Sequence, residues 1–393
     1  MKLFSSGDVM KREIILMSLI LLLSIPAFAD EYRVYFGNIH AHCSHSDGKG
    51  TALEAYTYAR DVAKLDFFSL TDHMEQLTED ELKEMISAAD STRVDGVYET
   101  LWGFEWGSPI YDHSNMFMTE HFYSIDCYIN DHLDKFYNEL VKYPPAFMQF
   151  NHPDYNPDSK LYNYRQYEYR SDVDEIISLI EVKSAFDSGD KQELSYIEAL
   201  DKGWHLSPVY NQDNHSPDWG TQNDCRAAVW LKSLNRDELI QGLKAGRTYS
   251  TCDKNAVVKW LCDGKWAGET IFHKESVSCE LTLSDPDAED NFTSLDIITN
   301  GGNVYNTIAD LKKDEPIRFD LKFSDTYRYF YLRIKMNDKI TVITAPFYYE
   351  KASYEDAGVD VNADASVDND AAQMDSGSKE ESESSGCGCN YLR

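Results

Sequence analysis

The sequence has little positive charge for its length. Its 393 residues include 37 Lys and Arg against 68 Asp and Glu, which gives a formal net charge of −31 at pH 7. Proteins that bind nucleic acid draw most of their affinity from Lys and Arg side chains that neutralise phosphates. We therefore expect no nucleic-acid partner.

The apolar stretch near the N-terminus is too short for a membrane span. It covers residues 14–25, whereas a transmembrane helix needs about 20 apolar residues. Lys11 and Arg12 precede it and Ala27-Phe28-Ala29 follows, which is typical of a secretory signal with a small-x-small cleavage site. We predict a signal peptide over residues 1–29, with an uncleaved anchor as the alternative. The protein is then exported (periplasmic, secreted or at the cell surface), without a stable membrane span after cleavage.

Cysteine is too sparse for a small disulfide scaffold. The chain has eight Cys; export permits disulfides, but their pairing cannot be read from the sequence. Cys43 directly follows His42. Alternation along a strand would turn the Cys43 side chain away from that imidazole, so we interpret it as a packing residue.

The sequence is rich in side chains that bind divalent metal ions. Neutral imidazoles mixed with carboxylates bind Zn²⁺, Mn²⁺ or Fe²⁺, and several close ions can convert water into hydroxide near neutral pH. The nine candidate ligands occur in short motifs: His40, His42, Asp47, His73, Glu105, His113, His152, Asp213 and His215.

Several of these motifs follow a short apolar run. Residues 34–36 precede His40, residues 65–70 lead into Asp72 and His73, residues 146–150 lead into His152, and residues 206–210 lead into Asp213. In a barrel of strands and helices, the carboxyl ends of the strands meet at one rim. The placement therefore predicts a single metal centre built from distant parts of the chain.

The pattern of apolar residues predicts an α/β fold with a second, all-β part. Strand and helix patterns alternate over about 220 residues, which indicates a parallel, barrel-like sheet with helices outside. Thr51 is a plausible N-cap for the first helix. The predicted helices cover residues 52–65, 79–89, 132–141, 191–200 and 236–243, and the later predicted strands of this part lie near residues 98–104, 147–150, 176–182, 207–210 and 227–231.

Beyond Arg247 the pattern changes to short alternating runs, which predict an antiparallel β-sandwich. From Ala357 to Gly386 the chain is acidic and nearly free of large apolar residues, so we predict a disordered tail. The predicted parts are a catalytic barrel over residues 30–248, a small sandwich over 249–350, and an acidic tail over 351–393 that ends in a CxC pair, Cys387 and Cys389.

Taken in order, the motifs resemble the signature of the PHP (polymerase and histidinol phosphatase) domain. They are His-x-His, Ser-Asp-Gly, Thr-Asp-His, Gly-x-Glu, a following His, His-Pro and Asp-x-His. Within that superfamily the chain is similar to the CehA/McbA-type metallohydrolases, the branch of the carbaryl hydrolases, through residues 239–250 and 327–346. The resemblance covers about residues 34–349 and implies a distorted (β/α)7 barrel.

The resemblance also implies roles for individual residues. His40, His42, Glu105 and Asp213 would hold one metal, Glu105, His113 and His152 a second, and Asp47, His73 and His215 a third. Two or three divalent ions (Zn, Mn or Fe) would thus bind. Glu105 would bridge two of them, and Glu105, Asp213 and Asp72 are the candidate catalytic residues. Asp72 would orient a ligand imidazole or handle a proton, and its alternative role is a strand-end cap.

One position departs from the pattern. Many PHP phosphatases have a basic residue shortly after the His-Pro pair, where this chain has Asp154. A carboxylate would repel a phosphate dianion, and Lys183 and Arg226 are the candidate residues to compensate. We therefore expect a metal-dependent hydrolase whose bridging hydroxide cleaves a small-molecule substrate at an ester-like bond (carbamate, carboxylester or amide) or a phosphoester bond. The alternatives are a PHP phosphoesterase proper and a surface-binding protein with a vestigial metal site.

Overall fold

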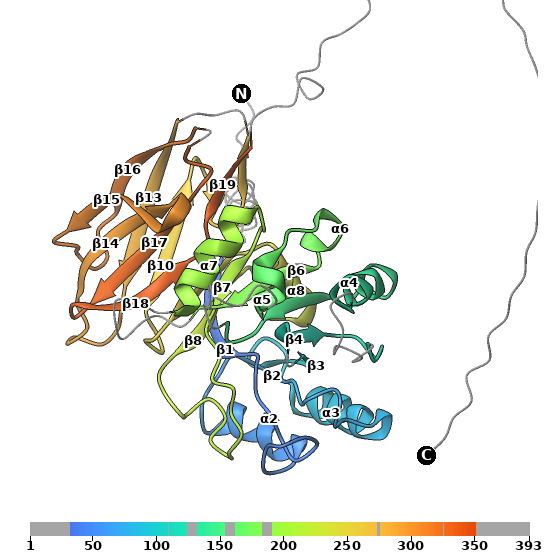
Figure 1. Ribbon diagram of the computed structural model, residues 1–393. Coiled ribbons are helices and arrows are strands. Elements are labelled where there is room, and N and C mark those ends of the chain that lie inside the picture. The colour runs from blue at the N-terminus through green and yellow to red at the C-terminus, as the bar shows by residue number, and fades with distance from the viewer. Residues whose placement is uncertain are drawn as a thin grey trace, which may run out of the picture. The chain divides into compact units, whose positions relative to one another are not determined.

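The structure is a computed structural model that describes residues 32–108, 110–123, 132–153, 162–182, 191–272, 276–324 and 326–350. The predicted signal peptide and acidic tail lie outside these residues, as do Asp154, Asp158 and Lys183. The described part is mixed α/β, with one large sheet and a second, smaller one (Figure 1).

The first half of the large sheet brings seven strands to one edge. In spatial order these are β1 (Arg33–Asn38), β2 (Phe67–Leu70), β3 (Glu99–Ser108), β4 (Asp112–Phe117), β5 (Phe147–Phe150), β6 (Ile177–Glu181) and β7 (Ser207–Val209). Six of them run parallel, and β4 runs antiparallel between β3 and β5. Because β4 begins where β3 ends, the start of β4 lies at the same edge as the carboxyl ends of the other six.

The predicted helices form close to their expected positions. They are α2 (Ala52–Asp61), α3 (Glu79–Thr92), α4 (His132–Lys142), α7 (Lys191–Lys202) and α8 (Arg236–Lys244), joined by the short α5 (Tyr162–Tyr167) and α6 (Ser171–Asp174). The Thr51 side chain accepts a hydrogen bond from Glu54 N and so caps α2, as predicted. The Glu54 side chain accepts in turn from Thr51 N, which completes a capping box. Thr78 and Glu81 form the same arrangement at the start of α3.

The strand predicted over residues 227–231 has the opposite direction to the one expected. It forms β8 (Arg226–Leu231) and pairs antiparallel with β1. No helix separates β7 from β8, so the right-handed crossover that a parallel neighbour requires is missing. Among the described strands, β7 pairs with β6 alone, and the closed seven-stranded barrel therefore stays a prediction.

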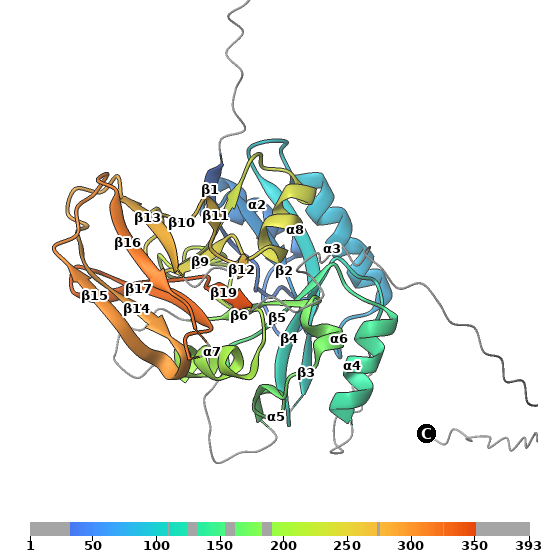
Figure 2. The ribbon, with the colours of Figure 1, turned by 90° about the horizontal axis from the view of Figure 1, so that it is seen from above.

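The strands after residue 247 are antiparallel in large part, as predicted, but they do not form a separate sheet system. β9 (Thr248–Thr251) pairs with both β8 and β18 (Lys339–Thr344), so the large sheet continues into β14 (Phe292–Thr299), β15 (Asn303–Ala309), β17 (Tyr329–Met336), β19 (Phe347–Glu350) and β12 (Thr270–Phe272). The 3-10 turn η1 (Asn300–Gly302) joins β14 to β15. Figure 2 shows β14, β15 and β17 on one side of β1 and the helices α2, α3 and α4 on the other.

A second sheet covers this late part of the first. It has four antiparallel strands in the order β11 (Lys265–Trp266), β10 (Val257–Cys262), β13 (Ser276–Ser284) and β16 (Ile317–Lys322). Trp260 and Leu281 from this sheet share one buried core with Leu332 and Ile334 of β17. Burial of these apolar side chains holds the two sheets together.

Two disulfides link the late part of the chain. Cys225 pairs with Cys252, and Cys262 pairs with Cys279, its cross-strand neighbour on β13. Disulfides are typical of proteins in oxidising compartments. Within the described residues, no helix combines the length and apolar character that a membrane crossing requires.

Candidate metal centre

Main-chain hydrogen bonds hold the segments that follow β1, β2 and β7 together at the sheet edge. The N–H of Asp213 donates to His40 O at 3.0 Å, and the N–H of His42 donates to Asn214 O at 2.8 Å. His73 pairs with Glu105 in a parallel bridge. The strand ladders thus continue past the strand ends, which places candidate ligands from four regions of the sequence side by side.

Close packing of β3 against β4 brings Glu105 beside His113. A Cβ atom on Gly103 would lie 2.2 Å from Met116 O, so only glycine permits this approach. Glu105 and His113 then project from neighbouring strands, with His113 Nδ1 lying 3.1 Å from Glu105 Oε1. This contact explains the glycine in the Gly-x-Glu motif.

Glu105 lies at the middle of the cluster and is 1% exposed. Its two oxygens face five imidazole rings at 3.1 to 3.4 Å, those of His40, His42, His73, His113 and His152. The rings of His40, His113 and His152 face Oε1, and those of His42 and His73 face Oε2. One carboxylate is therefore shared by most of the candidate ligands.

Asp213 and Asp47 complete the cluster on either side of His42. Asp213 Oδ1 lies 3.0 Å from His42 Nε2 and 3.2 Å from His40 Nε2. Asp47 Oδ1 lies 3.1 Å from His215 Nε2 and 3.6 Å from His73 Nε2. Potential ligand atoms within 4.8 Å of one another fall into four overlapping groups: His42, Asp47, His73 and His215; His40, His42 and Asp213; His40, Glu105 and His152; and His73, Glu105 and His113.

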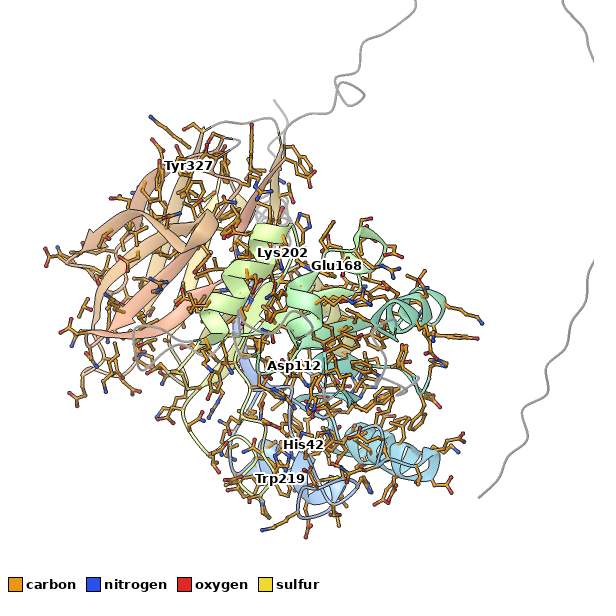
Figure 3. The ribbon with its side chains drawn as sticks, viewed as in Figure 1. His42, Asp112, Glu168, Lys202, Trp219 and Tyr327 are labelled. Carbon is orange, nitrogen blue, oxygen red and sulfur yellow. A yellow bond between two sulfur atoms is a disulfide. The ribbon has the colours of Figure 1, made fainter. Side chains whose placement is uncertain are left out.

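All nine predicted ligands thus meet in one place, although their division among individual ions stays a prediction. Figure 3 shows His42 in the same region of the molecule as Trp219, whose indole N–H donates to His42 O at 2.9 Å. This hydrogen bond fixes the main chain at His42, just before the loop that carries Asp47.

Several rings are held by one nitrogen so that the other faces the cluster. His40 Nδ1 lies 2.9 Å from Glu181 Oε1, and His215 Nδ1 lies 2.9 Å from the carbonyl oxygen of Asp213. A carboxylate and a carbonyl only accept, so each Nδ1 carries a hydrogen, and in the neutral ring each Nε2 presents a lone pair. Ligand imidazoles are normally fixed in this way.

The electrostatics of the cluster favour a positive occupant. Burial alone would lower the pKa of His40, but the surrounding carboxylates outweigh it and hold that pKa well above its usual value. Burial also acts to lower the pKa of His42 and of His152. Nearby carboxylates, Glu105 among them, outweigh it and raise each pKa to about 9. Burial alone would raise the pKa values of Glu105 and Asp213, but the neighbouring imidazoles outweigh it and keep both below normal.

The donor set fits divalent metal ions. Asp213 Oδ1 and His73 Nδ1 are buried without a partner of hydrogen-bond geometry, although ring nitrogens and carboxylate oxygens surround both. A cation satisfies such convergent lone pairs, and mixed imidazole and carboxylate ligands suit Zn²⁺, Mn²⁺ and Fe²⁺. Because binding displaces protons from the histidines, metal affinity at such a site depends on pH.

Asp72 is buried beside this cluster but does not touch a ligand ring. Its Oδ1 accepts hydrogen bonds from Cys43 N at 3.0 Å and from Ser46 Oγ at 2.7 Å, and its Oδ2 lies 3.1 Å from Cys43 Sγ. Ser46 Oγ in turn lies 3.3 Å from His42 Nδ1. Asp72 therefore reaches His42 through Ser46, and the Cys43 side chain is buried against Asp72, away from the candidate ligands.

Glu181 belongs to the site, yet the sequence motifs do not identify it. It is the last residue of β6, and besides His40 it accepts a hydrogen bond from the main-chain N–H of His152 at 2.7 Å. Its place at the end of an apolar strand, shared with other site residues, is the signal that could have found it. Glu181 also lines a pocket of about 140 Å³ with His152, Gln192, Tyr210, Asn211, Gln212 and Asp213.

Arg226 does not supply the missing basic residue. One terminal nitrogen of its buried guanidinium donates to Asn223 O at 2.9 Å and to Cys225 O at 2.7 Å. The group is thus committed to neighbouring main-chain carbonyls. The other compensating candidate, Lys183, and the departing residue, Asp154, lie outside the described residues.

Comparisons with known proteins include a structural likeness that spans most of the chain. No protein-family model matches the sequence, and no curated protein matches it. A solved two-domain protein from Bacteroides vulgatus, described as containing a predicted PHP-like metal-dependent phosphoesterase, is 17% identical with a TM-score of 0.43; the match covers 82% of this chain and 98% of that one. A DUF3823 family protein from Bacteroides ovatus is 9% identical over 25% of this chain and 56% of its own, with a TM-score of 0.18.

Proposed function

We propose that this chain is an exported, multinuclear metal-dependent hydrolase of the PHP type, in the CehA/McbA-like branch. The observation that supports the proposal is the convergence of nine candidate ligands around the buried Glu105. Two disulfides agree with export. The proposed reaction is hydrolysis of an ester-like bond (carbamate, carboxylester or amide) or of a phosphoester bond.

The proposed ligand sets follow the family pattern. In that pattern His40, His42, Glu105 and Asp213 would hold one ion, Glu105, His113 and His152 a second, and Asp47, His73 and His215 a third. Divalent ions in such sites lower the pKa of water and polarise the scissile bond. The chain's own part is to fix the ligands: Glu105 sets the spacing between two ion positions, and Asp72 orients His42 through Ser46.

The pocket beside the centre favours a substrate without a phosphate dianion. Its described lining consists of the carboxylates of Glu181 and Asp213, side-chain amides, one tyrosine and His152, with no Lys or Arg. The described lining thus offers no Lys or Arg to pair with a phosphate dianion, whereas the amides can hydrogen-bond a neutral or singly charged group. We therefore rank a carbamate, carboxylester, amide or phosphodiester above a phosphomonoester.

The test compares hydrolysis of four substrates by the metal-loaded full chain: an aryl carbamate, an aryl ester, a phosphodiester and a phosphomonoester. We expect turnover of at least one of the first three and the slowest turnover with the phosphomonoester. No hydrolysis of any of the four by a chain loaded with two or more ions would contradict the proposal and favour a binding protein.

Glu105→Gln tests the shared carboxylate. The change keeps size but removes charge, so we expect turnover to fall by more than about 100-fold and metal content to fall with it. Glu99→Gln is the matched control, because Glu99 lies on the same strand, is also 1% exposed, and pairs instead with Arg93 at 3.2 Å. Wild-type activity and metal content in Glu105→Gln would rule out the bridging role.

A further inference from the structure

One buried carboxylate contacts two of the predicted ligand motifs at once. Glu181, 6% exposed, accepts from His40 Nδ1 through Oε1 at 2.9 Å and from the main-chain N–H of His152 through Oε2 at 2.7 Å. The two contacts use different oxygens and reach segments that follow different strands, β1 and β5. In the ligand sets proposed above, His40 and His152 serve different ions.

Two side-chain amides complete the hydrogen bonding of Glu181. Asn211 Nδ2 and Gln149 Nε2 each donate to Oε1 at 3.0 Å. Asn211 Oδ1 also accepts from the main-chain N–H of Ile39 at 2.7 Å, which fixes the residue before His40. The carboxylate therefore has four donors and is fully satisfied at its position.

The same network extends to Glu105. Gln149 Nε2 donates to Asn151 Oδ1 at 2.8 Å, and Asn151 Nδ2 donates to Glu105 Oε1 at 2.7 Å. Through two amides, Glu181 is thus connected to the carboxylate that both ion positions share. A shift of Glu181 would be transmitted to His40, to His152 and to Glu105 together.

The main chain at His152 needs this support. His152 has φ of +25°, in the left-handed region that is unfavourable for a residue with a Cβ atom. Such conformations persist where surrounding contacts fix them. The hydrogen bond from His152 N–H to Glu181 is such a contact, because it fixes the main chain from which the imidazole reaches Glu105 Oε1 at 3.2 Å.

We propose that Glu181 is a positioning residue that holds His40 and His152 in register and so couples the loading of two metal positions. The proposal rests on the proposed function, since it needs both ions to bind. Glu181 fixes the tautomer of His40, which leaves Nε2 free for one ion, and it fixes the main chain that presents His152 to the other. Loss of this single carboxylate should weaken both positions together.

The experiment measures Zn²⁺ binding to the metal-free full chain by calorimetry and by competition with a chelator. For Glu181→Gln we expect affinity at both of the tightest positions to fall by about 10- to 100-fold, the range found when partners of metal ligands are removed. The amide places an NH₂ group against a donor, so one of the two contacts must be lost, and the shift of the side chain that follows disturbs the other contact as well. Thermal unfolding without metal separates this effect from a general loss of stability.

Glu193→Gln is the matched control. Glu193 is also 6% exposed, but it lies on α7 and pairs with Arg333 and Tyr331, away from the candidate ligands. This control should bind Zn²⁺ as the wild type does. If Glu181→Gln does not fold, Glu181→Asp takes its place, since it keeps the charge and shortens the reach by one methylene.

The outcomes separate the two proposals. Wild-type affinity at both positions in the Glu181 variant, or a loss confined to one position, would overturn the coupling while leaving the hydrolase proposal intact. A wild-type chain that binds none of Zn²⁺, Mn²⁺ and Fe²⁺ would instead overturn the proposed function itself.

Discussion

Asp66 is a half-buried carboxylate outside the candidate metal centre, and the fold opposes its charge. Its Oδ2 accepts from the main-chain N–H of Phe36 at 2.8 Å, which fixes the turn into β2 beside β1. Burial nevertheless raises the pKa of Asp66 to about 6, and the hydrogen bond from Phe36 offsets only part of this effect. The folded chain therefore binds the proton of Asp66 more tightly than the unfolded chain does.

This preference predicts a stabilising substitution. The unfolded pKa is about 3.9, so the ionised form costs the folded state free energy as pH rises from about 4 to about 6, and the cost is fully present at pH 7. Asp66→Asn should raise the free energy of unfolding at pH 7 by about 1 to 3 kcal/mol, with no gain near pH 4. Urea unfolding of the full chain at both pH values measures this.

Asp61→Asn provides the comparison for Asp66. Asp61 is solvent-exposed and its carboxylate pairs with Arg60 at 2.7 Å, which lowers the pKa of Asp61. Removal of that charge should give no gain at pH 7. Equal gains in the two variants, or a gain from Asp66→Asn that persists at pH 4, would contradict the assignment of the cost to burial.

At the scale of single residues, the sequence predicts the candidate ligands better than it predicts the side chains that hold those ligands in place. Each of the nine ligands is a His or acidic residue in a short motif, so residue type and order are enough to propose them. Glu181 ends a strand but lies outside any motif, and its side-chain partners come from the segment after β1, from β5 and from the segment after β7. The sequence likewise does not show that Ser46 links Asp72 to His42, because that contact depends on the path of the loop.

Among the elements, helices followed the sequence more closely than strand directions did. Periodicity and the Thr51 and Thr78 caps act within one helix, so they define α2 and α3 locally. β4 was not predicted, because its sequence Asp-His-Ser-Asn-Met-Phe is polar at its start and lacks the alternation of a half-buried strand. The direction of β8 depends on the path of residues 210–225, which no local pattern encodes.

The Cys225–Cys252 disulfide should stabilise the junction between the two sheet parts. It joins the segment before β8 to the end of β9, across a sequence separation of 27 residues. A bridge of this loop size restricts the unfolded chain by about 3 to 4 kcal/mol in the chain-entropy view. The double variant Cys225→Ala, Cys252→Ala should lose about that much unfolding free energy in urea.

Reduction provides the control for the Cys225–Cys252 prediction. The oxidised wild type should be more stable than the double variant, and the difference should shrink after both proteins are treated with a thiol reductant. An unfolding midpoint that is the same for the oxidised wild type and the double variant would show that this bridge contributes nothing to stability.

For the whole molecule, the charge and the sheet define where chemistry can occur. The large sheet continues without interruption from β7 to β12, and the candidate ligands gather at the edge reached by β1 to β7. The sequence predicts a change from alternating helices and strands to short strands near residue 247, but no local pattern encodes the pairing of β9 with both β8 and β18. The excess of acidic residues agrees with a centre that attracts cations.

The metal content of the purified full chain tests the central claim most directly. The chain is freed of metal, reconstituted with Zn²⁺, Mn²⁺ or Fe²⁺, dialysed against metal-free buffer, and its bound metal is measured by elemental analysis against protein concentration. Nine convergent ligands built around one shared carboxylate predict two or three ions per chain. Less than one bound ion per chain with every metal would contradict the multinuclear centre and the hydrolase built on it.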